Sequence, residues 1–445
     1  MSTAYLPTAR HLAPVDATGS RRLVVVVRAD PVICGHSGEA RNLAEAALLR
    51  GFTDVRIVTW GIDRLIESGL PLKPLDTVAP YSPGVVVERP EPVGDYRVPD
   101  GRHLAGIVGR LVELFTDGVP TVCMSLYLSP HQLAVSEALR VARATGLPVR
   151  VTTIAEAVGS DITNVVRTSL AEGRLGAAAQ VLSAYLDADV PVAVSRYTRD
   201  LIIDEAQEVD RRFGTRFAQE CLERIEVSYP AIDTADYVDL DPVERDRVLA
   251  GRGLVRDGYV FFLSRLVHAK GVDELIEGFA GSPACRDLRL VIAGNGPQEQ
   301  HLHEVARRSP AASRITFLHD VSDADKPALM AGCAAFVLPT KPRPEFIETF
   351  GIALAEKMLA GGGPVITTDT GGVAEAVGEH AAFVPVGDPG AIAAALDEAL
   401  ALPPAARAAL ETRARAYALQ FDRLAVLDTL LARLPGHEEE QMVFA

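Results

Sequence analysis

Two series of short apolar runs, each alternating with helical patterns, constrain the fold of this chain most strongly. The first series begins at "RLVVVVRAD" (22–30) and ends near residue 232, and the second runs from "YVFFLSRL" (259–266) to "AAFVPVGDP". Strands that are apolar along their whole length need cover on both faces, which helices between parallel strands provide. The sequence therefore predicts an α/β protein with two Rossmann-like domains, each a parallel sheet covered by helices.

The domain boundaries follow from composition between and after the two series. The polar stretch "DTADYVDLDPVERD" is the expected linker, so residues 1–235 form the first domain and residues 236–403 the second. An amphipathic stretch, 404–434, follows "ALPP". We expect this C-terminal helical segment to cross back and pack on the first domain.

Composition limits the partners of the chain. Its 445 residues include 44 Lys and Arg against 59 Asp and Glu, and the net charge of −15 disfavours nucleic acid and anionic membranes as partners. The five scattered cysteines indicate reduced thiols. The N-terminus lacks a signal peptide's apolar run, and no segment has the roughly 20 apolar residues of a membrane span. We therefore expect a cytoplasmic protein without stable membrane insertion.

The stretch "PEFIETFGIALAEKMLAGGGP" (344–364) places acids around a predicted helix over 351–360. Unpaired amides and the positive end of the helix dipole at Gly351 favour an anion such as phosphate. Glu348 precedes the helix and Glu356 lies inside it, so the two carboxylates belong to different parts of one pocket. Taken alone, a helix-capping Glu348 and a solvated Glu356 are the simpler explanation, and the neighbouring motifs decide against it.

Cations follow the first strand of the second series. "FLSRLVHAKG" (262–271) puts Arg265 and Lys270 at the carboxyl end of that strand, where open α/β sheets bind ligands, and two cations there suit a diphosphate. "AGNGP" (293–297) and "TGG" (370–372) end further strands in glycine, as expected where backbone approaches a ligand. Each of these signals is weak by itself.

The whole set, in this order and spacing, resembles the retaining nucleotide-sugar glycosyltransferases of family 4, which have two facing Rossmann-like domains (GT-B). The resemblance implies catalytic roles for Glu348, which would hold the donor sugar, and for Arg265 with Lys270, which would hold the diphosphate. Glu356 would bind the ribose, and three amides at the helix start would bind the diphosphate. The backbone near "FLHDV" would bind the base. Besides Arg265, Lys270 and Glu348, the resemblance implies these donor-binding positions: Gly35, Gly294, Asp320, Val321, Phe350, Gly351, Ile352 and Glu356.

The first half would bind the acceptor. Its loop "CGHSGE" resembles the family's glycine-rich loop, with Cys34 in place of the first glycine. Many family members carry a histidine where this chain has Ile154, so the role of that histidine is lost. Acceptor contacts are then expected from His36, Glu39, Tyr127, His131, Glu156 and Asp161.

We expect no metal and no cofactor. The histidines of "HLHE" (301–304) are two residues apart, on different sides of a helix. Arg265, Lys270 and helix amides would instead neutralise the departing diphosphate.

The resemblance implies a retaining glycosyltransferase of the hexosyltransferase type, which moves a sugar from a UDP-, GDP- or ADP-sugar to a small-molecule acceptor. An Ala- and Pro-rich composition suits secondary-metabolite (antibiotic) biosynthesis. Two alternatives stay open: a non-hydrolysing nucleotide-sugar epimerase of the same architecture, and a non-catalytic sugar-binding sensor. The sequence leaves undecided the donor base and sugar, the acceptor (aminocyclitol, thiol or simple sugar), the O-, S- or N-linkage, and the oligomeric state, with a homodimer as one option.

Overall fold

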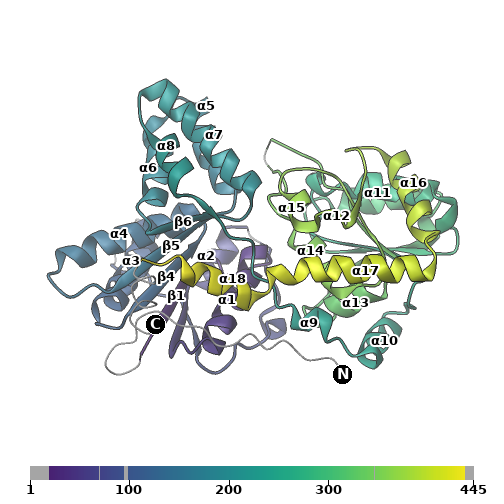
Figure 1. The fold of residues 1–445 in the computed structure, drawn as a ribbon, viewed down its shortest axis with the longest axis horizontal. Coiled ribbons are helices and arrows are strands. Elements are labelled where there is room, and N and C mark those ends of the chain that lie inside the picture. Colours follow the sequence, from purple (N-terminus) through teal and green to yellow (C-terminus); the bar gives the residue numbers. More distant parts are fainter. Residues whose placement is uncertain (1–19, 70, 95–98, 345, 436–445) are drawn as a thin grey trace, which may run out of the picture. The chain divides into compact units, whose positions relative to one another are not determined.

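The computed structural model describes residues 20–69, 71–94, 99–344 and 346–435. The chain forms two compact units, each built on a parallel sheet with flanking helices (Figure 1). The first unit comprises Met1–Ala193, Leu201–Ala231 and Arg423–Ala445, and the second comprises Val194–Asp200 and Ile232–Asp422. This architecture confirms the predicted fold class of two α/β domains.

The first sheet has seven strands in the order β3-β2-β1-β4-β5-β6-β7. All its recorded pairings are parallel, and Leu23 lies opposite both Val55 and Val122 in the centre. The strands are β1 (Arg22–Val26), β2 (Asp54–Val58), β3 (Val85–Glu88), β4 (Thr121–Leu126), β5 (Val151–Ala157), β6 (Val190–Ala193) and β7 (Glu226–Val227).

Helices cover both faces of this sheet, as its apolar strands require. On one face, α1 (Gly35–Leu49) and α18 (Arg423–Ala432) enclose a core that includes Leu43 and Leu427. On the other face, α3 (Pro99–Thr116) and α4 (Leu133–Ala144) pack over Val24 and Val26. Alternate residues of β1 therefore point into two separate cores.

The second sheet has six strands in the order β10-β9-β8-β11-β12-β13, again with parallel pairings. Its strands are β8 (Tyr259–Leu263), β9 (Arg289–Ala293), β10 (Ile315–Leu318), β11 (Ala335–Leu338), β12 (Val365–Thr367) and β13 (Ala381–Phe383). Around it, α11 (Val272–Gly281) contacts α16 (Pro389–Leu400), and α14 (Ile352–Ala360) contacts both α13 (Lys326–Gly332) and α17 (Pro404–Ala418).

The unit boundaries differ from those expected from the sequence. The stretch read as a linker forms α9 (Ala235–Val238) and α10 (Pro242–Gly251) of the second unit, because Tyr237 is buried there. The stretch 404–434 is divided: α17 belongs to the second unit and α18 to the first. The Ile232 amide donates to the Phe421 carbonyl (2.9 Å), so the two segments at the boundary lie side by side.

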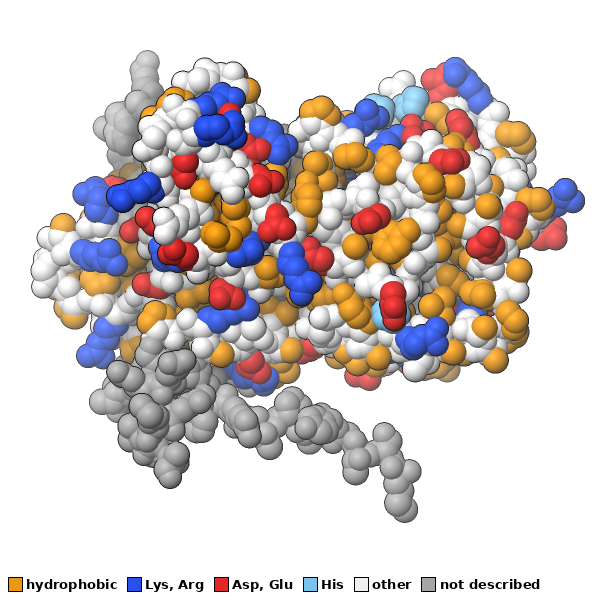
Figure 2. Space-filling view, turned by 45° about the horizontal axis from the view of Figure 1, so that its top comes forward, with side chains coloured by type: hydrophobic (Ala, Val, Ile, Leu, Met, Phe, Trp, Pro, Cys, Tyr) orange, Lys and Arg blue, Asp and Glu red, His pale blue; other side chains and the backbone are white. Residues whose placement is uncertain are grey.

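The surface charges and the apolarity of the helices can be read from the structure. Positive and negative side chains are interspersed on the face drawn in Figure 2, without a continuous basic stripe. Among the residues that the structure describes, no helix combines the length and apolarity needed to cross a membrane.

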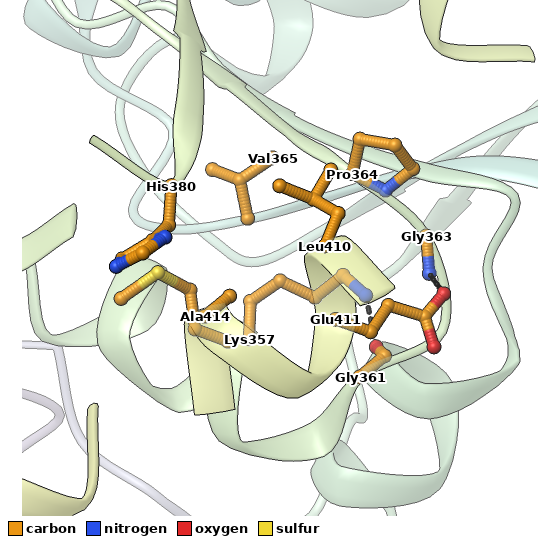
Figure 3. A pocket seen from close by; sticks show the side chains of 10 residues that line it. Lys357, Gly361, Gly363, Pro364, Val365, His380, Leu410, Glu411 and Ala414 are labelled. Atoms are coloured by element: carbon orange, nitrogen blue, oxygen red, sulfur yellow. Dashed lines mark hydrogen bonds between the residues drawn. The ribbon is translucent and has the colours of Figure 1, made fainter. Parts of the chain in front are cut away.

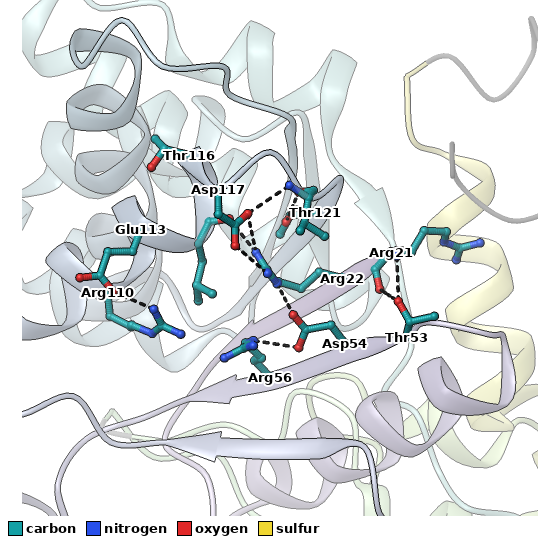
Figure 4. Close-up of polar contacts among 12 residues, drawn as sticks. Arg21, Arg22, Thr53, Asp54, Arg56, Arg110, Glu113, Thr116, Asp117 and Thr121 are labelled. Carbon is teal, nitrogen blue, oxygen red and sulfur yellow. Dashed lines mark hydrogen bonds and ion pairs between the residues drawn. The ribbon is translucent and has the colours of Figure 1, made fainter. Parts of the chain in front are cut away.

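A buried arginine joins three elements of the first unit (Figure 4). The Arg22 guanidinium, 4% exposed, contacts Asp54 at 2.6 Å and Asp117 at 2.7 Å, and it donates to the Leu114 carbonyl at 2.8 Å. These contacts connect β1, β2 and the end of α3. A buried cation of this kind is stabilising only while its partners stay in place.

We predict that Arg22→Gln lowers the free energy of unfolding by about 2–4 kcal/mol, because it takes the paired cation from Asp117 and leaves Asp54 with Arg56 alone. The matched control is Arg140→Gln, whose ion pair with Glu137 lies at the surface. That control should melt like the parent protein. Urea unfolding of the three proteins measures the difference, and equal stability of both variants would contradict the prediction.

Candidate functional site

The predicted donor-binding residues of the second unit gather at one edge of its sheet. Arg265 follows β8, Gly294 follows β9, Asp320 follows β10 and Glu348 follows β11. Because parallel strands end at the same edge, four segments distant in sequence meet there. Ligands of open α/β sheets bind at this edge.

The loop before α14 is held by the glycines of "TGG". The Gly372 amide donates to the Glu348 carbonyl at 2.9 Å, and a Cβ atom at Gly371 would lie 2.0 Å from that same oxygen. Gly351, with φ of 101°, is the N-cap of α14, which begins at Ile352. The loop therefore presents Glu348 from a fixed backbone directly before a helix N-terminus.

Close packing of two backbone segments requires glycine at position 294. Its φ is 137°, and a Cβ atom there would lie 1.9 Å from the Ser264 carbonyl oxygen. Glycine is therefore required where the loops after β8 and β9 touch. Contact between the two backbone segments is thus one reason for the glycine in "AGNGP", and contact with a ligand stays a prediction.

Glu348 and Lys270 form an ion pair within the second unit. The Lys270 ammonium contacts the Glu348 carboxylate, with side-chain exposures of 6% and 12%. The ring of Phe346 lies 4.8 Å from the ammonium and 5.4 Å from the Arg265 guanidinium carbon. The structure thus brings together the three residues to which the sequence assigned catalytic roles.

Arg265 differs from Lys270 in being exposed and without an ion pair to any residue that the structure describes. A guanidinium held near an aromatic ring keeps its hydrogen-bond donors available for an incoming anion. Arg265 is therefore the cation at this edge that a phosphate can reach at the lowest cost.

Glu356 is neither solvated nor alone. It accepts from Lys326 at 2.6 Å, and it also contacts the buried hydroxyl of Tyr237. Burial, followed by the nearby Glu356 carboxylate, raises the pKa of Tyr237 well above its usual range, so this phenol stays protonated. Sequence reasoning missed both partners; the signal for Lys326 was a cation soon after the strand "ITFLHD".

Phe350 and Asp320, whose backbone is predicted to meet the donor, have side chains with partners inside the protein. Phe350 is 2% exposed and packs edge-on against Phe421, with ring centroids 5.0 Å apart, so only its backbone is left for a ligand. Arg252 binds the Asp320 carboxylate at 2.8 Å and the Asp320 carbonyl at 3.2 Å, and this pairing lowers the pKa of Asp320. Val321 and Ile352 are partly exposed.

A small cavity on the other end of α14 has no part in this edge (Figure 3). Lys357 is fully buried there and donates to the Gly361 carbonyl, while Glu411 accepts from the Gly363 amide at 2.8 Å. These hydrogen bonds supply partners for backbone groups at the glycine-rich C-terminal end of α14. The cavity is therefore a packing space at this helix end.

In the first unit, three predicted acceptor-site residues form an aromatic group. Tyr127 lies edge-on to His36 and His131, with centroid distances of 6.2 and 5.7 Å. Tyr127 has φ of 142°, a strained value for a residue other than glycine. His36 and Tyr127 are partly exposed, whereas His131 is 1% exposed and packs on Trp60. His131 therefore packs against the buried side of the Tyr127 ring.

The other acidic candidates are buried. Glu39 and Glu156, 2% and 1% exposed, lie within hydrogen-bonding reach of each other, and Glu39 also accepts from the Ala231 amide at 3.2 Å. Burial raises the pKa of Glu39 to about 7, and burial with the adjacent Glu39 raises that of Glu156 well above its usual range. The pair therefore holds a proton at neutral pH.

Asp161 is a structural residue. It is fully buried and accepts from the amides of Leu128, Val158, Gly159 and Ile162. Burial nevertheless raises its pKa to about 6. Gly35 is the first residue of α1 and lies in the first unit, without the positive φ that distinguishes glycines in tight loops.

The Glu39–Glu156 pair predicts an unusual pH dependence of stability. Because the folded state keeps a proton that free carboxyls lose near pH 4.5, stability falls as pH rises from about 4.5 to 7. Glu156→Gln supplies an amide that donates to ionised Glu39. We expect this variant to match the parent at pH 5 and to exceed its unfolding free energy by about 1–2 kcal/mol at pH 8.

Urea unfolding at the two pH values measures this effect, with the exposed Glu398→Gln as control. Identical pH dependence of the parent and Glu156→Gln would show that the pair does not share a proton.

Comparison with known proteins shows which sequences and folds this chain is similar to. Residues 253–417 match the family model described as glycosyl transferases group 1. A GDP-mannose-dependent alpha-(1-6)-phosphatidylinositol monomannoside mannosyltransferase of Mycolicibacterium smegmatis is 32% identical over 52% of this chain and 58% of its own. A D-inositol 3-phosphate glycosyltransferase of Salinispora tropica is 31% identical over 43% of this chain and 41% of its own. The matches thus span about half the length of these relatives.

Solved structures share the fold of the whole chain. Anabaena HepE, in complex with UDP and glucose, has a TM-score of 0.66 at 19% identity and covers 95% of this chain and 100% of its own. WaaG, a glycosyltransferase involved in lipopolysaccharide biosynthesis, has a TM-score of 0.61 at 17% identity, covering 93% and 100%. The chain therefore has the GT-B fold, and its residues 253–417 are similar to the glycosyl transferases group 1.

Proposed function

We propose that this chain is a retaining, metal-independent glycosyltransferase that moves a hexosyl group from a nucleoside-diphosphate sugar to a small-molecule acceptor. The observation that carries the proposal is the edge of the second sheet, where Arg265 and the Lys270–Glu348 pair lie in the unit whose sequence is similar to glycosyl transferases group 1. The names of relatives and neighbours that mention GDP-mannose, UDP and UDP-glucose support a nucleotide-sugar donor.

The diphosphate needs positive charge, and more of it as the sugar departs. Arg265 and Lys270 supply two cations, and the first amides of α14 lack partners within the helix. Preorganised donors of this kind stabilise charge that develops in the transition state. In our proposal they take the place that a metal ion would otherwise have.

The two glutamates divide the donor between them. Glu356 lies inside α14 and binds the ribose hydroxyls, held in place by Lys326 and Tyr237. Glu348 precedes the helix and binds the transferred sugar. Lys270 balances the charge of Glu348. When the donor binds, this lysine contacts the phosphate as well as the carboxylate.

The acceptor would bind on the first unit, where His36 and Tyr127 offer partly exposed surface. The names of two relatives mention an inositol phosphate and a phosphatidylinositol mannoside, which makes polyols reasonable first acceptors to test. The role in antibiotic biosynthesis rests on composition alone and stays a prediction.

The test is a panel of UDP-, GDP- and ADP-sugars with inositol phosphate, aminocyclitol, thiol and simple-sugar acceptors, in excess chelator. Nucleotide release that requires an acceptor supports the proposal, and product anomeric configuration decides retention. Conversion of the donor sugar without any acceptor would instead indicate the epimerase. Binding of a sugar without turnover of any donor would indicate the sensor.

The variants Glu348→Gln and Glu356→Gln separate the two carboxylates. Glu356→Gln should weaken binding of the nucleoside diphosphate about 10–100-fold, because a charged hydrogen bond is worth about 1.5–3 kcal/mol. Glu348→Gln leaves Lys270 without a counter-charge, so nucleoside diphosphate should bind at least as tightly while kcat falls.

Calorimetry with the nucleoside diphosphate and steady-state kinetics measure these effects. Glu304→Gln is the control, since that glutamate forms a surface pair with Arg308. Full activity of Glu348→Gln would contradict the role of Glu348, and nucleotide binding that is lost on chelation would contradict metal independence.

A further inference from the structure

Three potential metal ligands meet where α12 (Glu299–Arg308) faces the end of β10. Glu299 and His303 are four residues apart on the helix, so their side chains share one face. His319 follows β10 by one residue. One ligand atom from each of the three side chains lies within 4.8 Å of the others.

The hydrogen bond of His319 fixes which nitrogen faces its neighbours. Its Nδ1 lies 3.0 Å from the Gly294 carbonyl oxygen, and since a carbonyl only accepts, Nδ1 carries the proton. In the neutral ring, Nε2 then holds a lone pair, and it lies 3.5 Å from the Glu299 carboxylate. A lone pair beside a carboxylate is unfavourable unless a proton or a metal cation lies between them, so this contact is a place where a metal cation can bind. A backbone carbonyl on the other ring nitrogen is also the usual support of a metal-bound histidine.

We propose that Glu299, His303 and His319 bind a first-row transition-metal dication such as Zn²⁺. Two imidazoles and one carboxylate suit Zn²⁺ and disfavour Mg²⁺ or Ca²⁺, which prefer oxygen ligands alone. A tetrahedral ion with bonds of about 2.0–2.1 Å holds its ligand atoms about 3.3 Å apart. The Glu299–His319 contact has nearly this spacing. Rotation of the partly exposed side chains would shorten the remaining distances between ligand atoms.

The surroundings leave a coordination position open. His303 and His319 line a surface groove of about 510 Å³, together with Arg307, Ile315 and Phe317. Water reaches a metal bound at its rim. Three protein ligands and one exchangeable position are the usual set of an open zinc site. This inference concerns a separate ligand set and does not rest on the proposed glycosyl transfer.

We expected no metal ligands in this segment because the two histidines of "HLHE" are two apart. They do face different partners: His301 lies near His268, whereas His303 packs on Phe317 and lies near His319. The relevant partner of His303 on the helix is Glu299, four residues earlier, and the third ligand comes from another element.

The test is calorimetric titration of the chelator-treated, tag-free chain with Zn²⁺, and the spectrum of the Co²⁺ form reports the coordination number. We expect one strong site with four-coordinate Co²⁺ bands. His319→Gln and Glu299→Gln should each weaken binding about 10–100-fold. His301→Gln, on the same helix, is the matched control and should bind like the parent.

Glu299→Gln is the decisive variant, because this side chain is partly exposed and contributes little to folding, and the melting temperature of the variant checks this. Absence of a Zn²⁺ site in the parent would overturn the proposal. So would binding that persists in both His319→Gln and Glu299→Gln but is lost in His301→Gln.

Discussion

Parallel pairing of the strands is the constraint on which the rest of this structure depends. In each sheet every recorded pairing is parallel, so all carboxyl ends of the strands lie on one edge. Segments as distant as Arg265 and Glu348 meet there without any direct connection. The helices that return the chain also supply the N-terminus of α14 beside those side chains. One topological rule thus collects cations, carboxylates and helix amides in one place.

Two lysine–glutamate pairs then set the electrostatics of that edge. Lys270 with Glu348, and Lys326 with Glu356, place opposite charges together in partly buried positions, where an unpaired charge would be costly. Each pair can exchange a protein partner for a polar group of a ligand at little net cost in charge. In the proposed function, Arg265 supplies the additional cation that an incoming diphosphate requires. In the first unit the opposite solution applies: Glu39 and Glu156 are buried, form no ion pair with any residue in the described part of the chain, and retain a proton.

The sequence predicted both sheets because apolar runs and helical periods are local signals. It also located the start of α14 within one residue, since Gly351 and the three glycines after Ala360 mark both ends. It did not find Tyr237 and Lys326 beside Glu356, because these contacts join segments that only tertiary packing brings together. For the same reason the sequence does not show that Gly294 packs against the Ser264 carbonyl or that Asp161 accepts hydrogen bonds from four amides.

Hydrogen–deuterium exchange with and without the nucleoside diphosphate that binds most tightly tests the central claim most directly. The claim is that this ligand lies against the start of α14 and the loop after β8. Exchange should slow in peptides covering residues 346–356 and 264–271 and stay unchanged around the helix end at Lys357 and Glu411. If the nucleotide binds by calorimetry while exchange in both peptides is unchanged, the ligand binds elsewhere and the account is wrong.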